Sequence, residues 1–242
     1  RQFVTAWVPE DGGGIPWRKQ DQFFNAPANG PAGIFLARYV NSQGGRLRRA
    51  QQMADWIDET LIDPETHLVF DGIKGGSLVR AQYTYCQGVV LGLETELSVR
   101  TSDGRHPARV HRLVAAIDAH MAPGGVLPGA GGGDGGLFSG ITARYLALTA
   151  TALPGATDED AAARDTARRI VLSSAQAAWD NRQTVDGLPL FGASWDQTAE
   201  IPAGGGDRAL AQADALLDLR AKHVVYCVAS GVPRNAVKIG PM

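Results

Sequence analysis

The spacing between the predicted helices constrains the fold of this chain more than any other feature. Long segments rich in glycine, aromatic and polar residues precede helices that are apolar nearly all round, at 11–32, 71–85, 123–138 and 186–207. Short turns follow these helices, near 42–45, 101–106 and 154–158. Stacked helical hairpins with this spacing gather their long loops on one rim, where a ligand cleft can form.

Two kinds of helix are expected. Apolar stripes on one side predict outer helices over 46–62, 106–121 and 158–180, the last with Asp158 as its cap. Apolar or small residues on every face predict buried helices over 31–40, 83–99 and 137–153. A further striped helix is expected over 208–230. Gly88 and Gly92, four residues apart, allow another helix to approach closely.

A weak internal repeat supports a hairpin array. Ala37-Arg38-Tyr39 recurs as Ala143-Arg144-Tyr145, which fits a period of about 50 residues with one buried and one amphipathic helix. Such units must stack on neighbours to bury their apolar faces. We therefore predict an all-α fold, an (α/α)6 toroid or a partial toroid of helical hairpins, as a single domain over 1–242 that is incomplete at its N-terminus. Short strands are expected only in the long loops, for example at 68–70.

Composition excludes several classes of function. The formal net charge is −2 with both signs mixed along the chain, which argues against a nucleic-acid or membrane-surface partner. No apolar run reaches the roughly 18 residues of a transmembrane span. Cys86 and Cys227 are too few for a disulfide scaffold and are expected as buried thiols. The five histidines lack metal-ligand spacing, so no metal or cofactor is expected.

The first two long loops carry binding candidates with two interpretations each. Trp17 follows a glycine-rich turn and either stacks on a sugar face or plugs the core. Asn29 either caps a buried helix or presents its amide to a hydroxyl group. Tyr85 and Gln87 begin the next buried helix, where they suit polyol recognition or belong to the core.

The later loops add acids and one aromatic residue. The glycine-rich segment 131–136 does not fit a phosphate-binding loop, because no Lys-Ser/Thr follows and no strand precedes it. Asp134 in this segment remains an acid in an expected cleft. Trp195, with Asp196 and Glu200, forms a last candidate in which an aromatic platform and carboxylates share a loop.

The motifs together form an ordered series. It consists of GGGIPWRK at 12–19, Asn25 followed by Asn29-Gly-Pro-Ala, VFDG at 69–72, YTYCQGV at 83–89 and GLFSGITARY at 136–145. This series resembles glycoside hydrolase family 76, which contains endo-α-1,6-mannanases and related fungal cell-wall transglycosidases. The resemblance runs from about residue 11 to the end of the chain.

The resemblance implies an (α/α)6 toroid with a sugar groove on one rim. It also implies retaining cleavage of α-1,6-linked mannose by two carboxylates about 5 Å apart. In the family these are consecutive aspartates, but no Asp-Asp pair occurs in the 242 residues, so the pair is expected upstream. Glu10-Asp11 does not match that position. Cys86 stands where the family has Asn, and Ser139 where it has Lys.

The leading hypothesis is a retaining glycoside hydrolase acting on α-1,6-mannan or a mannose-containing envelope glycan. The alternative is a non-catalytic glycan-binding protein of the same fold. A toroid epimerase that works through histidines and an α-solenoid interaction module fit less well. The predicted partner is an oligosaccharide or polysaccharide, bound by a monomer. The chain begins with Arg1 and shows no signal peptide, which leaves cytoplasmic and exported locations open. The predicted substrate-binding residues are Trp17, Asn29, Asp71, Tyr85, Gln87 and Asp134.

Overall fold

A computed structural model of the chain describes residues 2–8, 13–39, 45–131, 133–185 and 187–201. Most of this part of the chain is helical, as predicted. The helices are α1 (Gln2–Thr5), α2 (Ala26–Arg38), α3 (Gly45–Thr60), α4 (Thr84–Arg100), α5 (Arg105–Ala116), the π-helix η1 (Ile117–Met121), the 3-10 helix η2 (Gly133–Leu137), α6 (Phe138–Ala152) and α7 (Asp158–Asp180). The strands are β1 (Phe23–Asn25), β2 (Gly72–Lys74), β3 (Ser77–Val79), β4 (Gln183–Val185) and β5 (Leu188–Leu190).

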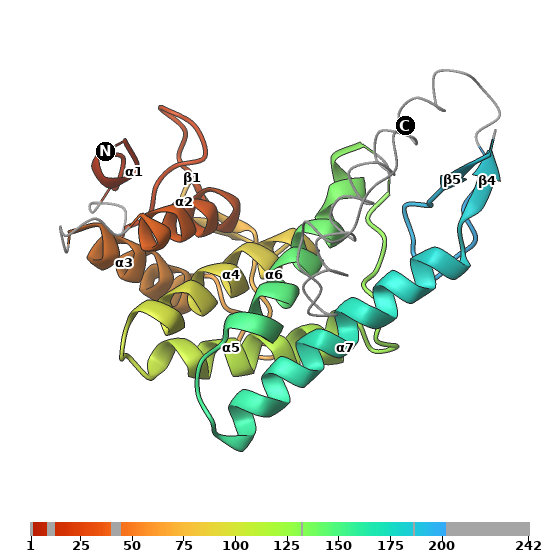
Figure 1. The fold of residues 1–242 in the computed structure, drawn as a ribbon. Coiled ribbons are helices and arrows are strands. Elements are labelled where there is room, and N and C mark those ends of the chain that lie inside the picture. Colours follow the sequence, from red (N-terminus) through yellow and green to blue (C-terminus); the bar gives the residue numbers. More distant parts are fainter. Residues whose placement is uncertain (1, 9–12, 40–44, 132, 186, 202–242) are drawn as a thin grey trace.

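Three helical hairpins, α2–α3, α4–α5 and α6–α7, form an arc of two layers (Figure 1). Helix α4 packs between α2 and α6 in the inner layer, and α5 contacts α7 in the outer layer. The inner helices begin about 55 residues apart, which confirms a hairpin repeat. The Ala-Arg-Tyr triplets are not equivalent within it, because the first ends α2 whereas the second lies in the first half of α6.

The helix bounds follow the sequence pattern closely, and the differences arise at the caps. Helix α2 begins at Ala26 rather than at Pro31, because the side chain of Asn25 accepts a hydrogen bond from Ala28 N–H and caps the helix. Thr157 rather than Asp158 caps α7, in a capping box with Asp160. The predicted helix 106–121 ends as the π-helix η1. The predicted helix 208–230 and Cys227 lie outside the described residues.

Glycines allow the inner helices to approach each other. A Cβ atom on Gly88 would lie 2.7 Å from the Cα of Thr142, and one on Gly92 would overlap the ring of Tyr145. Because real Cβ atoms do not come so close, α4 and α6 reach their observed separation only with glycine at both positions. The predicted close approach of another helix to Gly88 and Gly92 is therefore confirmed.

Two small antiparallel sheets stabilise the long loops. Strands β1, β2 and β3 form one sheet in that order, with Phe24 opposite Ile73 and Ile73 opposite Leu78. This sheet joins the loop before α2 to the loop before α4. The expected strand at 68–70 is wrong, since this segment contributes only an isolated bridge between Val69 and Ile62. In the described part of the chain no helix is both long and apolar enough to cross a membrane.

A buried ionic cluster joins α3, α4 and α5. The Nδ1 of His106 lies 2.6 Å from the fully buried carboxyl of Glu94. Arg109 lies 2.8 Å from Asp55 and 3.0 Å from Asp58. Burial raises the pKa of Glu94, and its hydrogen bond to His106 opposes that shift. These contacts join the outer helices α3 and α5 to the inner helix α4.

Candidate functional site

The loop before α2 is fixed by the buried amide of Asn29. Its Oδ1 accepts a hydrogen bond from Ile15 N–H at 2.8 Å, and its Nδ2 donates to the carbonyls of Ile15 at 3.0 Å and Asn25 at 2.9 Å. Both amide hydrogens are therefore engaged within the chain. The structure places Asn29 inside α2, fully buried, as a residue that positions the loop.

Gln87 holds the loop before α4 in the same way. Its Oε1 accepts from Val69 N–H at 2.7 Å, and its Nε2 donates to the carbonyls of Val69 at 2.8 Å and Tyr83 at 3.0 Å. The side chain is fully buried. Both amides satisfy backbone groups that the loops would otherwise leave unpaired, which explains why polar residues occupy these core positions.

Asp71 lies where two of these loops meet. Its N–H donates to the carbonyl of Ala81 at 2.7 Å, and its carbonyl accepts from Ala26 N–H at 2.9 Å. The Sγ of Cys86 lies 3.7 Å from Oδ1 of Asp71. Burial raises the pKa of the half-buried Asp71 carboxyl, and the contact with the thiol partly opposes that shift. Cys86 is a buried free thiol, as predicted.

Three aromatic rings at the N-terminal ends of α4 and α6 form a group that we call the aromatic cluster: Tyr83, Tyr85 and Phe138. The rings of Tyr83 and Tyr85 stack with centroids 5.7 Å apart, and Phe138 lies 4.2 Å from Tyr85. Burial, followed by electrostatic interactions with Cys86 and Asp71, raises the pKa of Tyr85. The Tyr85 hydroxyl therefore stays protonated and can donate a hydrogen bond.

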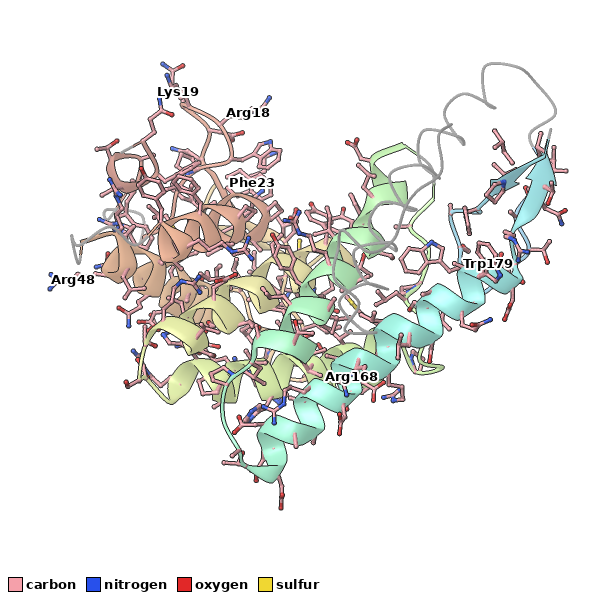
Figure 2. All side chains as sticks on the ribbon, viewed as in Figure 1. Arg18, Lys19, Phe23, Arg48, Arg168 and Trp179 are labelled. Carbon is pink, nitrogen blue, oxygen red and sulfur yellow. The ribbon has the colours of Figure 1, made fainter. Side chains whose placement is uncertain are left out.

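The other predicted site residues lie apart from this group. Trp17 is 52% exposed on the loop before β1, where its backbone N–H donates to the backbone carbonyl of Phe23 at 2.7 Å. Figure 2 shows Arg18 and Lys19 pointing away from the body of the molecule on the same loop. Asp134 is exposed on η2. The structure thus brings together Asp71 and Tyr85, while Trp17 and Asp134 occupy separate exposed loops.

The interpretation of Trp195 as an exposed aromatic platform is wrong. Its side chain is only 4% exposed and belongs to the hydrophobic core. The backbone carbonyl of Trp195 accepts a hydrogen bond from Asn181 at 3.0 Å. Its neighbour Asp196 is exposed, as is Glu200. Within the described ranges, no group of three His, Cys, Asp or Glu side chains is placed to hold a metal ion.

A pocket of about 770 Å³ adjoins the aromatic cluster. Tyr83 and Phe138 line it, whereas none of the six predicted binding residues does. Sequence reasoning missed this pocket because its wall combines five segments that are distant in sequence: Leu68, residues 82–84, residues 120–130, Phe138 and Asp196. The glycines and prolines at 123–130 signal a loop, but they do not indicate where that loop folds.

The fold and the site define a class of protein: an arc of α/α-hairpins that carries aromatic and acidic side chains at one end of its inner helices. The family model of glycosyl hydrolase family 76 matches residues 1–219. The chain belongs to this family. No curated protein sequence matches the chain.

Solved structures agree with this assignment. The GH76A alpha-1,6-mannanase from Salegentibacter sp. HEL1_6 is 29% identical with a TM-score of 0.76, over 93% of this chain and 66% of that one. A variant of that enzyme with two consecutive aspartates replaced by alanine is described as inactive and was solved with alpha-1,6-mannotetrose. The Lin0763 protein from Listeria innocua is 27% identical with a TM-score of 0.71, over 91% of this chain and 62% of that one. The chain thus spans just under two thirds of the length of these proteins.

A more distant relative shows the fold alone. Dfg5 from Chaetomium thermophilum, solved with glucosamine, is 20% identical with a TM-score of 0.74, over 98% of this chain and 60% of that one. The match extends over nearly all of this chain, so the α/α-hairpin architecture is shared by proteins of widely different sequence.

Proposed function

We propose that this chain forms the glycan-binding rim of a glycoside hydrolase that acts on α-1,6-linked mannose polymers. The observation that carries the proposal is the half-buried Asp71 carboxyl, 3.7 Å from the thiol of Cys86, next to the aromatic cluster that contains Tyr85, the neighbour of Cys86 in sequence. Family membership and the mannanase among the similar structures support a mannose polymer as the substrate.

The chemistry of Asp71 and Tyr85 suits a sugar. The apolar face of a pyranose ring packs against an aromatic ring, while its hydroxyls bond to polar groups at the edge. Here the Tyr85 ring supplies the stacking surface, and its hydroxyl and the Asp71 carboxyl supply a donor and an acceptor. Trp17 and Asp134 contact more distant sugar units from their exposed loops. Asn29 and Gln87 act indirectly, because their amides hold the loops in place.

Cleavage in this proposal is retaining and uses two carboxylates about 5 Å apart. In this proposal the pair consists of consecutive aspartates, which do not occur among the 242 residues. The inactive Salegentibacter variant, in which consecutive aspartates are replaced, supports this assignment. Asp71 orients the sugar and takes no part in bond cleavage.

The second candidate is a glycan-binding protein without hydrolytic activity. The absence of an Asp-Asp pair from the 242 residues favours it. Both candidates predict binding of α-1,6-linked mannose oligosaccharides, and only the first predicts cleavage.

Incubation of the complete gene product with α-1,6-mannan, followed by product analysis, separates the two. The first candidate predicts that hydrolysis produces shorter mannose oligosaccharides. These products initially carry the α-anomeric configuration, as retaining chemistry requires. Binding without any product supports the second candidate. If the protein neither binds nor cleaves any mannose polymer, both candidates are overturned.

A further inference from the structure

One face of the small sheet formed by β1, β2 and β3 carries aromatic and cationic side chains in a row. Phe23 lies directly opposite Lys74, so both side chains point to the same face. The bridge between Pro16 and Phe24 continues the pairing, and it places Trp17 opposite Phe23 on that face. We call Trp17, Phe23 and Lys74 the sheet row.

The sheet row is open to solvent. Trp17 and Lys74 are exposed, whereas Phe24 and Ile73 on the opposite face pack against the hydrophobic core. The Nζ of Lys74 lies 5.9 Å from the centroid of the Phe23 ring. The sheet row therefore offers a flat apolar surface directly beside a positive charge.

More cations gather at the same end of the sheet. The loop between Trp17 and Phe23 carries Arg18 and Lys19, which Figure 2 shows at the outer end of this loop, farther from the body of the molecule than Phe23. The backbone N–H of Gly75 donates to the carbonyl of Gln22 at 3.0 Å, which holds the turn after Lys74 beside this loop.

This end of the sheet has an excess of positive charge. Asp21 is the one acid in the loop, and its carboxylate lies 3.2 Å from the guanidinium of Arg18. Lys19 and Lys74 have no ionic partner in the part of the chain that the structure describes. Three cations and one carboxylate give a formal charge of +2.

The later long loops have the opposite charge. Asp134 lies in one of them, and Asp196 and Glu200 lie in the other, while segments 123–137 and 191–200 contain neither Lys nor Arg. An anionic part of a ligand is therefore attracted to the sheet and repelled by the later loops.

We infer that the sheet row, with Arg18 and Lys19, binds a phosphate group carried by the mannose polymer. The inference rests on the proposed function. A phosphate monoester has a charge of about −1.5 to −2 at pH 7, which matches the excess on the sheet. Strand β2 follows Asp71 directly, so Lys74 lies about 10 Å from Asp71 along an extended chain. An oligosaccharide of a few units can contact both.

Titration calorimetry with five probes tests this inference. The probes are the neutral α-1,6-mannose tetrasaccharide, two derivatives with a phosphate at one end or the other, and two with a carboxylate at the same ends. At about 0.01 M salt, at least one phosphorylated probe is expected to bind about tenfold more tightly than the neutral probe. Salt at about 1 M is expected to remove most of this preference. The carboxylate probes, with less charge, are expected to gain less.

Two double variants locate the effect on the sheet. Lys19→Gln combined with Lys74→Gln is expected to bring the ratio of phosphorylated to neutral affinity close to one. Arg48→Gln combined with Arg168→Gln is the matched control, because it removes two exposed cations from α3 and α7 and is expected to keep the ratio. Thermal unfolding verifies that each variant folds.

The outcomes separate this inference from the proposed function. Equal binding of the neutral and phosphorylated probes overturns only the inference. Carboxylate probes that bind as tightly as the phosphorylated ones contradict a phosphate. A preference that survives loss of both lysines, or that the control variant loses equally, contradicts a site on the sheet. Failure of all five probes to bind overturns the proposed function, and the inference with it.

Discussion

Asn29 and Ile15 form a reciprocal pair in which the Asn29 side chain accepts from Ile15 N–H and donates to the Ile15 carbonyl, at 2.8 and 3.0 Å. This pair fixes the glycine-rich loop to α2 as a strand partner would. Because Asn29 is fully buried, water cannot replace either hydrogen bond. The loop that carries Trp17 therefore takes its position from a residue inside the helix.

Asn29→Ala is expected to lower the free energy of unfolding by about 3 kcal/mol, because it leaves buried backbone groups of Ile15 without partners. Urea denaturation measures the change. Gln176→Ala is the matched control, because this exposed amide on α7 bonds to Asp180, and its change is expected to stay within about 0.5 kcal/mol. Equal effects of the two substitutions would show that the buried hydrogen bonds between Asn29 and Ile15 contribute no more to the free energy of unfolding than an exposed one.

Gly88→Ala is expected to destabilise the protein by about 1–3 kcal/mol, because the new methyl group would meet the backbone of Thr142, which cannot rotate away. Gly104→Ala is the control, since its new methyl group would meet no atom within 4 Å and its backbone is already in the right-handed helical region. Thermal unfolding of both variants tests this. A Gly88→Ala protein as stable as the control would mean that α4 and α6 can move apart at no cost.

Tyr85→Ala is expected to weaken binding of the α-1,6-mannose tetrasaccharide about tenfold or more, through loss of the stacking surface. Tyr85→Phe keeps the ring and is expected to lose less affinity. The size of this loss measures the contribution of the hydroxyl to binding. Tyr39→Ala, an exposed tyrosine at the opposite end of α2, controls for loss of a ring and is expected to leave affinity unchanged. Titration calorimetry gives all three values, and the same loss for Tyr39→Ala would contradict a site at Tyr85.

The stability conferred by Asp71 is expected to depend on pH. Because burial raises its pKa in the folded protein, the folded state holds this proton more tightly than the unfolded state. The stabilising contribution is therefore complete below the usual carboxyl pKa of about 3.9 and is lost as the pH rises through the higher folded value.

Asp71→Asn removes this titration. We compare the free energy of unfolding of the variant with that of the unmodified chain at each pH. The difference is expected to favour the variant more at about pH 7 than at about pH 3. Urea denaturation at both pH values measures the two differences. The reverse order would show that the carboxylate is stabilised in its charged form, and an unchanged difference would show that burial does not affect its protonation.

The sequence predicts the architecture well because helical periodicity is a local property. One-sided stripes mark α3, α5 and α7, and apolar residues on all faces mark α2, α4 and α6, which pack between neighbours. The start of α2 differs from the prediction because Asn25, and not the predicted Asn29, caps the helix, which only the hydrogen bonds of the two side chains show. Cap chemistry alone cannot decide between two asparagines one turn apart.

The candidate site is harder to predict, because its residues come from distant segments. The amides of Asn29 and Gln87 look suited to sugar hydroxyls in the sequence, yet their partners are backbone groups of loops at Ile15 and Val69. The contact between Asp71 and Cys86 depends on how the loop before α4 folds back onto the helix. No local pattern encodes either relationship.

A crystal structure of the complete gene product with the α-1,6-mannose tetrasaccharide tests the central claim most directly. The account predicts a mannose unit stacked on the ring of Tyr85, with one of its hydroxyls bonded to the carboxyl of Asp71. A tetrasaccharide bound elsewhere, with no sugar atom in contact with either residue, would contradict it.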